Sequence, residues 1–560
     1  MKIFLSQQNY HIGNFEANTA KMLAAIAEAK KQNGDLIVFS ELAVCGYPPR
    51  DFLEFNDFVE QGLACIELMK EAADTIGVLV GCPSRNPKKE GKDLFNSAYL
   101  LYQKEIKGIV HKSLLPNYDI FDEYRYFEPA FEWNVLSFKG KKLAVTVCED
   151  IWNLGDDPLY RVCPMDVLIR QQPHIMINLS ASPFDYVHED GRKGIVKQNV
   201  LKYGLPMVYC NTVGSQTEIV FDGGSLVMNV NGDIVSEMPY FTEAMSSVTW
   251  NDDGSFTENV VRTADKISIV KLTPETFNPQ KGIDKIHQAL LLGIRDYFSK
   301  MGFRKAIVAS SGGIDSAVVL AVACEALGPE NVNALLLPSQ FSTAHSVSDA
   351  EQLSKNLGNH FDTIPIKDVF ESFEKALSPV FKDLPFNVAE ENLQSRIRGA
   401  LVMAMSNKFG TILLNTSNKS ELATGYGTLY GDMAGGLSIL GDLYKTQVYA
   451  LANYINRNKE IIPQNIIAKA PSAELRHDQK DSDSLPEYDI LDPILYQYIE
   501  RMQGPKELVG KGFDAALVSR ILKLVNTNEY KRNQFCPIIR VSPKAFGIGR
   551  RVPIVGKYLT

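Results

Sequence analysis

The sequence has no long apolar run, no paired cysteines and no excess of positive charge. No apolar stretch approaches the roughly 20 residues that a membrane-spanning helix needs. The start of the chain, Met1 to Asn9, becomes polar too early for a signal peptide. The eight cysteines are scattered without a CxxC pair, which favours reduced thiols over a disulfide framework or a zinc site. We therefore expect a cytoplasmic protein without structural disulfides.

The charge balance argues against a nucleic-acid partner. The 58 Lys and Arg residues are outnumbered by 66 Asp and Glu residues, giving a net charge of -8, whereas nucleic-acid binding is expected to leave a basic footprint. The content of 45% apolar and 22% charged residues is typical of a soluble globular protein. We therefore expect no nucleic-acid partner, and no membrane partner either; the small-molecule substrates are implied by the resemblances described below.

A chain of 560 residues is longer than one hydrophobic core usually supports, so at least two domains are expected. Alternating strand and helix patterns indicate two α/β units. In residues 1–262, short β-rich runs such as Leu36–Phe39 alternate with helical patterns. Residues 263–282 contain two prolines and are typical of a linker. Residues 283–560 begin with an amphipathic helical pattern, Ile283–Met301, and alternate again. We expect two α/β domains separated by that linker.

A glycine-rich turn follows a short apolar run in the second unit. Ala306–Ala309 reads as a strand, Ser310–Ser316 as a turn and Ala317–Ala323 as a helix. Such a turn aims backbone N–H groups, and the positive end of the helix dipole, at an anion. The Lys of the Walker pattern is missing. The residues instead resemble the SGGxDS pyrophosphate loop of the N-type ATP pyrophosphatases; the alternative is an ordinary turn between strand and helix.

That resemblance implies a set of ATP ligands. Asp315 would hold magnesium, and the hydroxyls of Ser311 and Ser316 would bind phosphate oxygens. The implied ATP-binding turn comprises Ser310, Ser311, Gly312, Gly313, Ile314, Asp315 and Ser316.

Three reactive side chains in the first unit each follow an apparent strand. Glu41 follows Leu36–Ser40, Lys112 follows Gly108–His111, and Cys148 follows Leu143–Val147. Strand ends at one edge of a sheet can converge. A carboxylate that takes a proton, an ammonium that stabilises an oxyanion and a thiol that attacks an amide form a complete acyl-transfer set. Taken singly, each has an ordinary alternative as a surface charge or, for Cys148, as a small buried apolar residue.

The surrounding residues resemble the nitrilase (carbon–nitrogen hydrolase) family in order and spacing. The matching stretches are 39–51, 111–118 and 147–152. The resemblance implies that Glu41 is the general base, Lys112 the electrophilic stabiliser and Cys148 the nucleophile that forms a thioester. It also implies glutamine-binding roles for Tyr118, Glu149, Ser182 and Arg192, although Lys193 competes with Arg192 for the substrate carboxylate. Glu123 is either a second acid near Lys112 or a salt-bridged loop carboxylate.

The rest of the second unit resembles the NAD synthetase family, so that the likeness to glutamine-dependent NAD synthetases covers nearly the whole chain. The matching stretches include 390–399, 413–421, 430–436 and 442–448. The resemblance assigns Asp315 and Glu421 to magnesium, which prefers hard carboxylate ligands. It assigns further ATP contacts to Thr416, Lys445 and Ser472, and deamido-NAD contacts to Asn392, Glu421 and Lys531. The alternatives are cap or turn hydroxyls for Thr416 and Ser472, and a solvated helix face for Lys445 and Asn392.

These resemblances imply a nitrilase α-β-β-α sandwich followed by a Rossmann-like doubly wound parallel sheet that binds ATP at its strand ends. They imply that ammonia from L-glutamine amidates deamido-NAD to NAD through an adenylate, with ATP and Mg²⁺, an internal ammonia channel and a homo-oligomer. Other readings are a different glutamine-fed ATP pyrophosphatase, a nucleotide-binding sensor with an inactive amidase module, and a stand-alone amidase.

Overall fold

The computed structural model describes residues 1–155, 158–257, 275–472, 474–476, 479, 481–483 and 485–559, without the side chains of 188–190 and 344. The chain divides into two compact units, Met1–Phe184 with His188–Leu272, and Asp185–Val187 with Thr273–Thr560. Most of the predicted linker, residues 263–274, lies outside the described residues. The domain boundaries at 262 and 283 stay predictions. No helix within the described ranges is long and apolar enough to cross a membrane.

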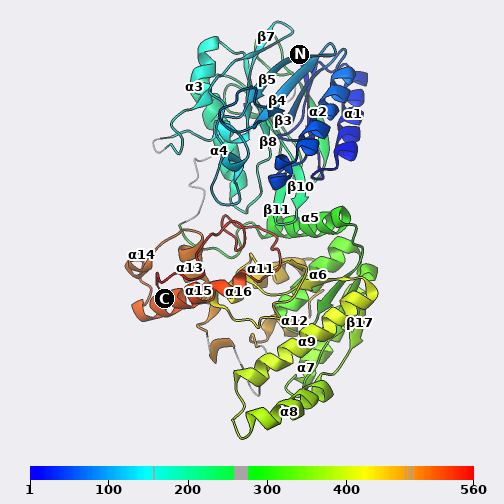
Figure 1. Ribbon diagram of the computed structural model, residues 1–560, viewed down its shortest axis with the longest axis vertical. Helices are drawn as coiled ribbons and strands as arrows, with labels where there is room; N and C mark the ends of the chain where they lie inside the picture. The colour runs from blue at the N-terminus through cyan, green and yellow to red at the C-terminus, as the bar shows by residue number, and fades with distance from the viewer. Residues whose placement is uncertain are drawn as a thin grey trace. The chain divides into compact units, whose positions relative to one another are not determined.

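Unit 1 contains two six-stranded sheets (Figure 1). The first has the order β14-β1-β2-β3-β4-β5 and consists of Ala244–Thr249, Lys2–Gln7, Leu36–Val38, Gly77–Arg85, Leu94–Tyr102 and Glu105–His111. The second has the order β13-β12-β9-β8-β7-β6 and consists of Ile234–Glu237, Leu226–Met228, Met207–Asn211, Ile175–Ser180, Lys141–Val147 and Leu136–Phe138. A hairpin, β10 (Val213–Gln216) with β11 (Ile219–Asp222), is separate from both.

The two sheets of unit 1 pack face to face and are covered by helices on their outer faces. One buried cluster joins Ile3 and Leu79 of the first sheet to Val145 and Ile177 of the second. Helix α4 (His188–Tyr203) packs with Val196 on the other face of the second sheet, beside the short α3 (Pro164–Leu168). Helices α1 (Phe15–Lys31) and α2 (Asn56–Ala72) pair with each other, and α2 lies against β3, β4 and β5. The predicted α-β-β-α sandwich is confirmed.

Unit 2 is built on a five-stranded parallel sheet with the order β17-β16-β15-β18-β19. The strands are His360–Thr363, Val332–Leu336, Ala306–Ala309, Ile412–Asn415 and Leu437–Ser438. Strands β16 and β17 lie on one side of β15, and the next strands along the chain, β18 and β19, lie on its other side. The strand order therefore reverses at β15. Ligands of open α/β sheets bind beside the carboxyl end of the strand at such a switch point.

Helices cover both faces of this sheet. Helices α8 (Lys367–Phe381) and α9 (Val388–Phe409) contribute Phe370, Ile397 and Val402 to a buried cluster with strand residues of one face. Helices α5 (Ile283–Met301), α6 (Ile314–Leu327) and α11 (Lys445–Ile455) pack against one another on the other face, and α7 (Ala344–Leu357) joins β16 to β17. The predicted doubly wound parallel sheet is confirmed.

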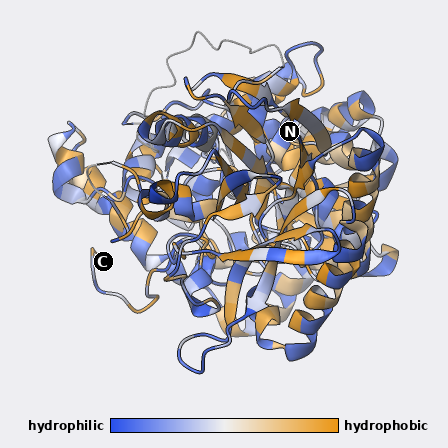
Figure 2. Ribbon diagram, turned by 90° about the horizontal axis from the view of Figure 1, so that it is seen from above, coloured by the Kyte–Doolittle hydropathy of each residue, from blue (hydrophilic) through white to orange (hydrophobic). Residues whose placement is uncertain are grey.

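The remaining α-helices of unit 2 are α10 (Lys419–Thr424), α12 (Gln464–Ala468), α13 (Tyr488–Ile499), α14 (Pro505–Gly510), α15 (Ala515–Thr527) and α16 (Glu529–Arg532). Of these, α10, α13, α14 and α15 contribute to a second buried core, whereas α12 packs against α6 and α7. Figure 2 shows the apolar residues, in orange, concentrated along strands and on one side of the helices. This segregation is what burial of apolar area produces in a layered α/β fold.

Two candidate active sites

Cys148 lies at a strained turn directly after strand β7. It opens a single 3-10 turn, Cys148–Ile151, with φ at +41°, a left-handed conformation that is uncommon for a residue other than glycine. The carboxylate of Asp150 holds this turn, because it accepts hydrogen bonds from the backbone N–H of Val147 at 3.0 Å and of Ser113 and Leu114 at 2.9 Å. The same carboxylate therefore ties the cysteine turn to the residues that follow Lys112.

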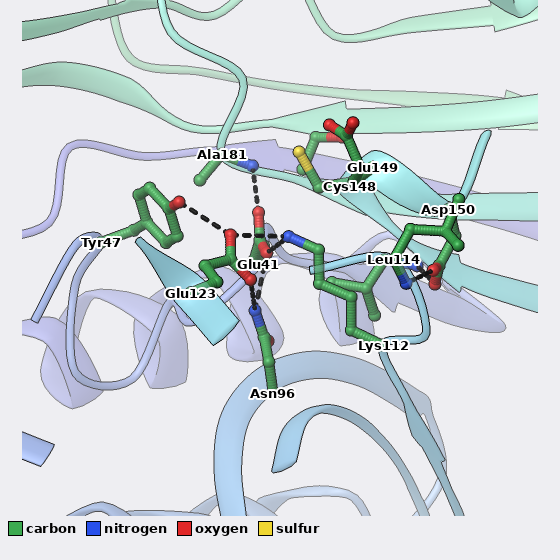
Figure 3. Close-up of polar contacts among 12 residues, drawn as sticks. Glu41, Tyr47, Asn96, Lys112, Leu114, Glu123, Cys148, Glu149, Asp150 and Ala181 are labelled. Atoms are coloured by element: carbon green, nitrogen blue, oxygen red, sulfur yellow. Dashed lines mark hydrogen bonds and ion pairs between the residues drawn. The ribbon is translucent and has the colours of Figure 1, made fainter. Parts of the chain in front are cut away.

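Lys112 lies between two carboxylates in the interior of unit 1 (Figure 3). Its ammonium donates to Glu41 Oε1 and to Glu123 Oε1, each at 2.7 Å, and its side chain is completely buried. Asn96 Nδ2 also donates to Glu41 Oε1 at 2.7 Å, while the other oxygen, Oε2, accepts from the backbone N–H of Ala181 at 3.0 Å. Figure 3 shows the Cys148 sulfur close to this cluster. The structure thus brings Glu41, Lys112 and Cys148 together.

Burial and neighbouring charge shift the titration of this site. Burial raises the pKa of the Cys148 thiol well above its usual value; the charge of Glu41 adds to this and that of Lys112 opposes it. For Lys112, burial alone would lower the pKa, but the charges of Glu123 and Glu41 hold it well above the usual range. Burial, opposed by Lys112 and supported by the charge of Glu41, raises the pKa of Glu123 to about 7. At neutral pH the site therefore contains a neutral thiol beside a charged lysine.

Of the four predicted glutamine-binding residues, Tyr118 and Glu149 contact each other, and Ser182 lies near the end of β8. Tyr118 donates its hydroxyl to Glu149 Oε1 at 2.9 Å, and Tyr160 donates to the same oxygen at 3.1 Å. Glu149 is buried beside Cys148, and burial raises its pKa against the opposing charge of Lys112. Ser182 follows the end of β8 and donates its backbone N–H to Asn211 at 2.8 Å.

Both basic candidates for the substrate carboxylate are already ion-paired. The guanidinium of Arg192 binds both carboxylate oxygens of Asp222, at 2.8 and 2.5 Å, and this pair is buried. Lys193 binds Glu237 at 2.7 Å and is only partly buried. The charge of Arg192 is therefore largely compensated within the protein.

The phosphate loop has the strand–turn–helix form that the sequence predicts. It joins β15 to α6, and Gly313 is the N-cap of that helix. Gly312 has a φ of +77°, and a Cβ added there would lie 2.2 Å from the carbonyl oxygen of Ser346, so only glycine fits. The Ser316 hydroxyl accepts from the Ser311 backbone N–H at 3.2 Å, and the Ser311 hydroxyl accepts from the Gly313 N–H at 3.2 Å.

Two carboxylates and a lysine meet beside this loop. Lys445 Nζ lies 2.5 Å from Asp315 Oδ2 and 3.7 Å from Glu421 Oε1, and Lys445 is buried, so the solvated-face alternative for it is wrong. Asn418, the N-cap of α10, donates to Asp315 Oδ1 at 2.9 Å and holds Glu421 through a capping box. Burial and the charge of Asp315 raise the pKa of Glu421 well above its usual value.

This donor set fits a magnesium ion. Mg²⁺ is a hard cation that takes one or two carboxylates together with phosphate oxygens. The two carboxylates here are held near each other, against their mutual repulsion, by the Lys445 ammonium and by hydrogen bonds from Asn418. Among the described residues, no group of three or more His, Cys, Asp or Glu side chains could hold an ion without further ligands. Nucleotide phosphates and water would therefore supply the remaining oxygens.

A cavity of about 270 Å³ lies over the carboxyl ends of β15, β16 and β18. Its lining includes most of the predicted ATP-binding residues: Ser310, Ser311, Gly313, Ile314, Asp315, Ser316, Thr416, Lys445 and Ser472. Glu421, predicted to bind magnesium and deamido-NAD, lines it as well. The alternative role for Ser472, a turn hydroxyl, is also observed. Its hydroxyl donates to the carbonyl of Gln479 at 2.5 Å and accepts from the Glu474 N–H at 3.2 Å. The cavity is at the switch point of the sheet, where a nucleotide is expected.

Two of the predicted deamido-NAD residues are not in that lining. Asn392 accepts a hydrogen bond from the Thr428 hydroxyl at 2.7 Å. Lys531 donates to the carbonyls of Gly425 at 2.7 Å and Gly427 at 2.8 Å, and burial lowers its pKa. Both therefore hold the segment after α10, between Gly425 and Thr428.

Sequence reasoning assigned no role to Asn96 or Asp150, although both shape the site of unit 1. Asn96 is completely buried within β4 and contacts both Glu41 and Glu123. A polar residue inside an otherwise apolar strand was the available signal. Asp150 lies two residues after Cys148, but its three backbone contacts become evident only from the fold.

Comparisons with known proteins agree with this two-site arrangement. Residues 2–253 match the carbon-nitrogen hydrolase family and residues 286–535 match the NAD synthase family. The glutamine-dependent NAD(+) synthetase of Synechocystis sp. is 43% identical over 560 residues, covering 99% of this chain and 98% of the relative. That of Thermotoga maritima is 39% identical over 581 residues, covering 100% of this chain and 99% of the relative.

The solved structures give the same result. The structure of the glutamine-dependent NAD+ synthetase from Acinetobacter baumannii in complex with ADP has a TM-score of 0.76 and 36% identity, covering 99% of this chain and 98% of that one. The chain therefore combines a carbon–nitrogen hydrolase with an NAD synthase, which defines it as a ligase with two sites. It belongs to the family of glutamine-dependent NAD(+) synthetases.

Proposed function

We propose that this chain converts deamido-NAD to NAD with ATP and L-glutamine, and that it releases AMP, pyrophosphate and glutamate. The observation that carries the proposal is the presence, in one chain of this family, of a buried Glu–Lys–Cys site and a phosphate loop at a sheet switch point. The first site suits amide hydrolysis, and the second suits adenylation of a carboxylate.

In unit 1, Glu41 acts as general base and takes the thiol proton of Cys148. The sulfur attacks the side-chain amide carbon of glutamine, and the Lys112 ammonium stabilises the negative charge that develops on the amide oxygen. The C–N bond then breaks, Glu41 returns the proton to the leaving nitrogen, and ammonia departs from a thioester. Water, deprotonated by Glu41, hydrolyses the thioester, so that glutamate leaves and the thiol is restored.

Glutamine is held by the residues around the thiol. Tyr118 and Glu149 lie on one side of Cys148 and are already hydrogen-bonded to each other. Ser182 binds the amino-acid head group in this proposal, and Arg192 meets the substrate carboxylate with a charge that it shares with Asp222. Lys193 is the alternative, since its partner Glu237 is more accessible to solvent.

In unit 2, a nicotinate carboxylate oxygen attacks the α-phosphorus of ATP, and the bond to pyrophosphate breaks. Ammonia then attacks the carbonyl carbon of this adenylate, AMP leaves, and the amide of NAD is formed. The loop N–H groups, the hydroxyls of Ser311, Ser316, Thr416 and Ser472, and the Lys445 ammonium bind ATP. Asp315 and Glu421 would hold Mg²⁺, which when bound supplies positive charge to phosphate oxygens. Asn392, Glu421 and Lys531 position the dinucleotide.

Ammonia has to remain unprotonated until it meets the adenylate, because ammonium has no lone pair for attack. We therefore include an internal ammonia channel in the proposal. The proposal also includes a homo-oligomer that works in the cytoplasm. Besides deamido-NAD and L-glutamine, the reaction would need ATP and Mg²⁺. Sedimentation of the purified protein measures its oligomeric state.

The test is NAD formation from deamido-NAD, ATP and magnesium, with either glutamine or ammonium chloride as the nitrogen source. Cys148→Ala should abolish the glutamine-driven reaction and keep the ammonium-driven one, because only the first needs the thiol. No NAD from either source in the wild type would overturn the proposal. A protein that releases no pyrophosphate would be a binding protein, and one that needs no ATP would be an amidase.

A further inference from the structure

The cavity of unit 2 contains three cationic side chains within its described lining, and two of them are paired. Lys445 binds Asp315 and Glu421. Lys469 binds Glu474 Oε1 and the Ser346 hydroxyl, each at 2.5 Å. The third cation, Arg398, has no carboxylate within ion-pair distance among the described residues.

Within the part of the chain that the structure describes, one hydrogen bond holds the Arg398 side chain. Arg398 lies on α9, and its Nε donates to the carbonyl of Leu337 at 3.0 Å, at the carboxyl end of β16. This bond uses one of five guanidinium N–H groups and fixes the plane of the fork, so the terminal nitrogens are left for another partner. Because Arg398 lines the cavity that also contains the phosphate loop, a ligand bound in this cavity can reach it.

The electrostatics of Arg398 agree with this geometry. Burial lowers the pKa of its guanidinium to about 10, and the more distant charges of Glu474 and Asp432 only partly oppose this effect. Glu474 is itself bound by Lys469, and Asp432 accepts the backbone N–H of Thr428 at 2.6 Å. Arg398 is partly buried, and even a partly buried cation without a close anion is unfavourable in a folded protein. An anionic ligand that enters the cavity would compensate it.

We propose that Arg398 is a binding residue for anionic phosphate oxygens of the nucleotide in this cavity, in addition to the phosphate loop and Lys445. Phosphate is the favoured ligand because a planar guanidinium fork matches two phosphate oxygens, and because the neighbouring loop is shaped for the same group. The source is either ATP or the diphosphate of the dinucleotide. This inference deepens the proposed function and rests on it for the identity of the nucleotides.

The experiment measures binding to the full-length protein by calorimetry, with ATP and deamido-NAD titrated separately so that no turnover occurs. Arg398→Met should weaken the binding of one of the two by about 10- to 100-fold, as expected for the loss of a charge-assisted contact. Arg398→Lys should recover part of the loss because it keeps the charge but not the fork. Weaker ATP binding would identify ATP as the source, and weaker deamido-NAD binding would identify the dinucleotide.

The matched control is Arg295→Met. Arg295 is exposed on α5 and donates to the carbonyls of Ala326 and Glu325, outside the cavity lining, so its removal should change neither affinity. A structural arginine would instead lower the unfolding temperature of the ligand-free protein when replaced. Arg398→Met should leave that temperature unchanged or raise it, because it removes a partly buried charge that has no carboxylate within ion-pair distance among the described residues.

Two results would overturn the inference. The first is an affinity for both nucleotides within twofold of the wild type in Arg398→Met. The second is a loss of affinity accompanied by a lower unfolding temperature without ligand. A wild type that binds both nucleotides but forms no NAD would refute the proposed function alone, whereas one that binds neither would refute both.

Discussion

The nucleophile of unit 1 depends on its neighbours because its own environment disfavours the thiolate. Burial and the charge of Glu41 raise the pKa of Cys148, and Lys112 compensates this only in part. A thiol that stays protonated at neutral pH needs a base at the moment of attack. Glu41 is available for this, since among the described residues one of its oxygens accepts a hydrogen bond from the Ala181 N–H alone, while the other is shared by Lys112 and Asn96.

Replacing this base should therefore suppress glutamine hydrolysis selectively. We expect Glu41→Gln to lower the rate of glutamate release by about 10²- to 10⁴-fold, the usual contribution of general-base catalysis. NAD formation from ammonium chloride should be unchanged. The control is Glu60→Gln, an exposed carboxylate of α2 that pairs with Arg85. Glutamate release within twofold of the wild type in Glu41→Gln would exclude this carboxylate as the base.

Glu123 should make the stability of unit 1 depend on pH. Its pKa is raised to about 7 in the fold, by burial and the charge of Glu41 against the opposing charge of Lys112, from an ordinary value of 4.5. The folded state therefore binds the proton more tightly than the unfolded state. This contribution to stability is complete below about pH 4.5 and is lost as the pH rises through about 7.

The variant Glu123→Gln imitates the protonated side chain at every pH. We expect its unfolding temperature to match that of the wild type near pH 4.5 and to exceed it progressively up to about pH 7.5. The hydroxyl of Tyr47 and the ammonium of Lys112 still find an oxygen acceptor in the amide. Thermal unfolding across this pH range measures the difference, and a difference that stays constant or reverses its sign would contradict the raised pKa.

At the scale of elements, the turn between β15 and α6 depends on one glycine. Gly312 has positive φ, and its α-carbon faces the Ser346 carbonyl of the next helix along the chain, α7. A methyl group at this position has to displace backbone, whereas at Gly313 the nearest atom is the flexible Ser311 hydroxyl, at 3.2 Å. The two neighbouring glycines therefore differ in their tolerance of alanine.

This difference gives a paired prediction. Gly312→Ala should weaken ATP binding by at least about 10-fold, because the strain of order 1–3 kcal/mol is relieved by moving the loop. Gly313→Ala should have a clearly smaller effect. Calorimetric titration with ATP compares the two variants, and equal losses would indicate that the close approach to Ser346 is not what shapes the loop.

Local patterns in the sequence predicted two α/β units and a grouping of Glu41, Lys112 and Cys148, whereas the two particular folds were predicted from the resemblance of sequence motifs to known families. In the structure, Glu41 and Lys112 follow strands β2 and β5 of the first sheet, whereas Cys148 follows β7 of the second, so the three residues come from two sheets and not from one edge of a single sheet. The phosphate loop was equally local, since strand, turn and helix fall within one continuous stretch, residues 306–327.

The remaining details come from long-range packing and could not be read from the chain. Lys445 and Asp315 are 130 residues apart and lie on different helices, so their contact depends on the whole sheet order. The pairing of Arg192 with Asp222 likewise requires α4 and β11 to be placed first. The role of Arg398 could not be predicted from the residues around it in the sequence. What distinguishes Arg398 is that no carboxylate among the described residues lies within ion-pair distance of it, and this depends on the fold.

At the scale of the whole molecule, the two chemistries have separate structural supports. Unit 1 has its own buried clusters between its two sheets and under α4. Unit 2 has others, against its parallel sheet and around α13. A substitution that removes the reaction of one site without disturbing its packing should therefore leave the other site intact.

Asp315→Asn provides the complement of Cys148→Ala. The amide has the shape of the carboxylate but lacks its charge, so it should not support the Mg²⁺ site proposed for Asp315 and Glu421. We expect NAD formation to fall by at least about 10²-fold with glutamine and with ammonium chloride alike, because this charge acts on the phosphates in either case. Alkylation of Cys148 by the glutamine analogue 6-diazo-5-oxonorleucine, followed by mass spectrometry, should continue. NAD formation that is lost only with glutamine would place Asp315 in the glutamine-dependent step, and loss of alkylation would show that the two sites are not independent.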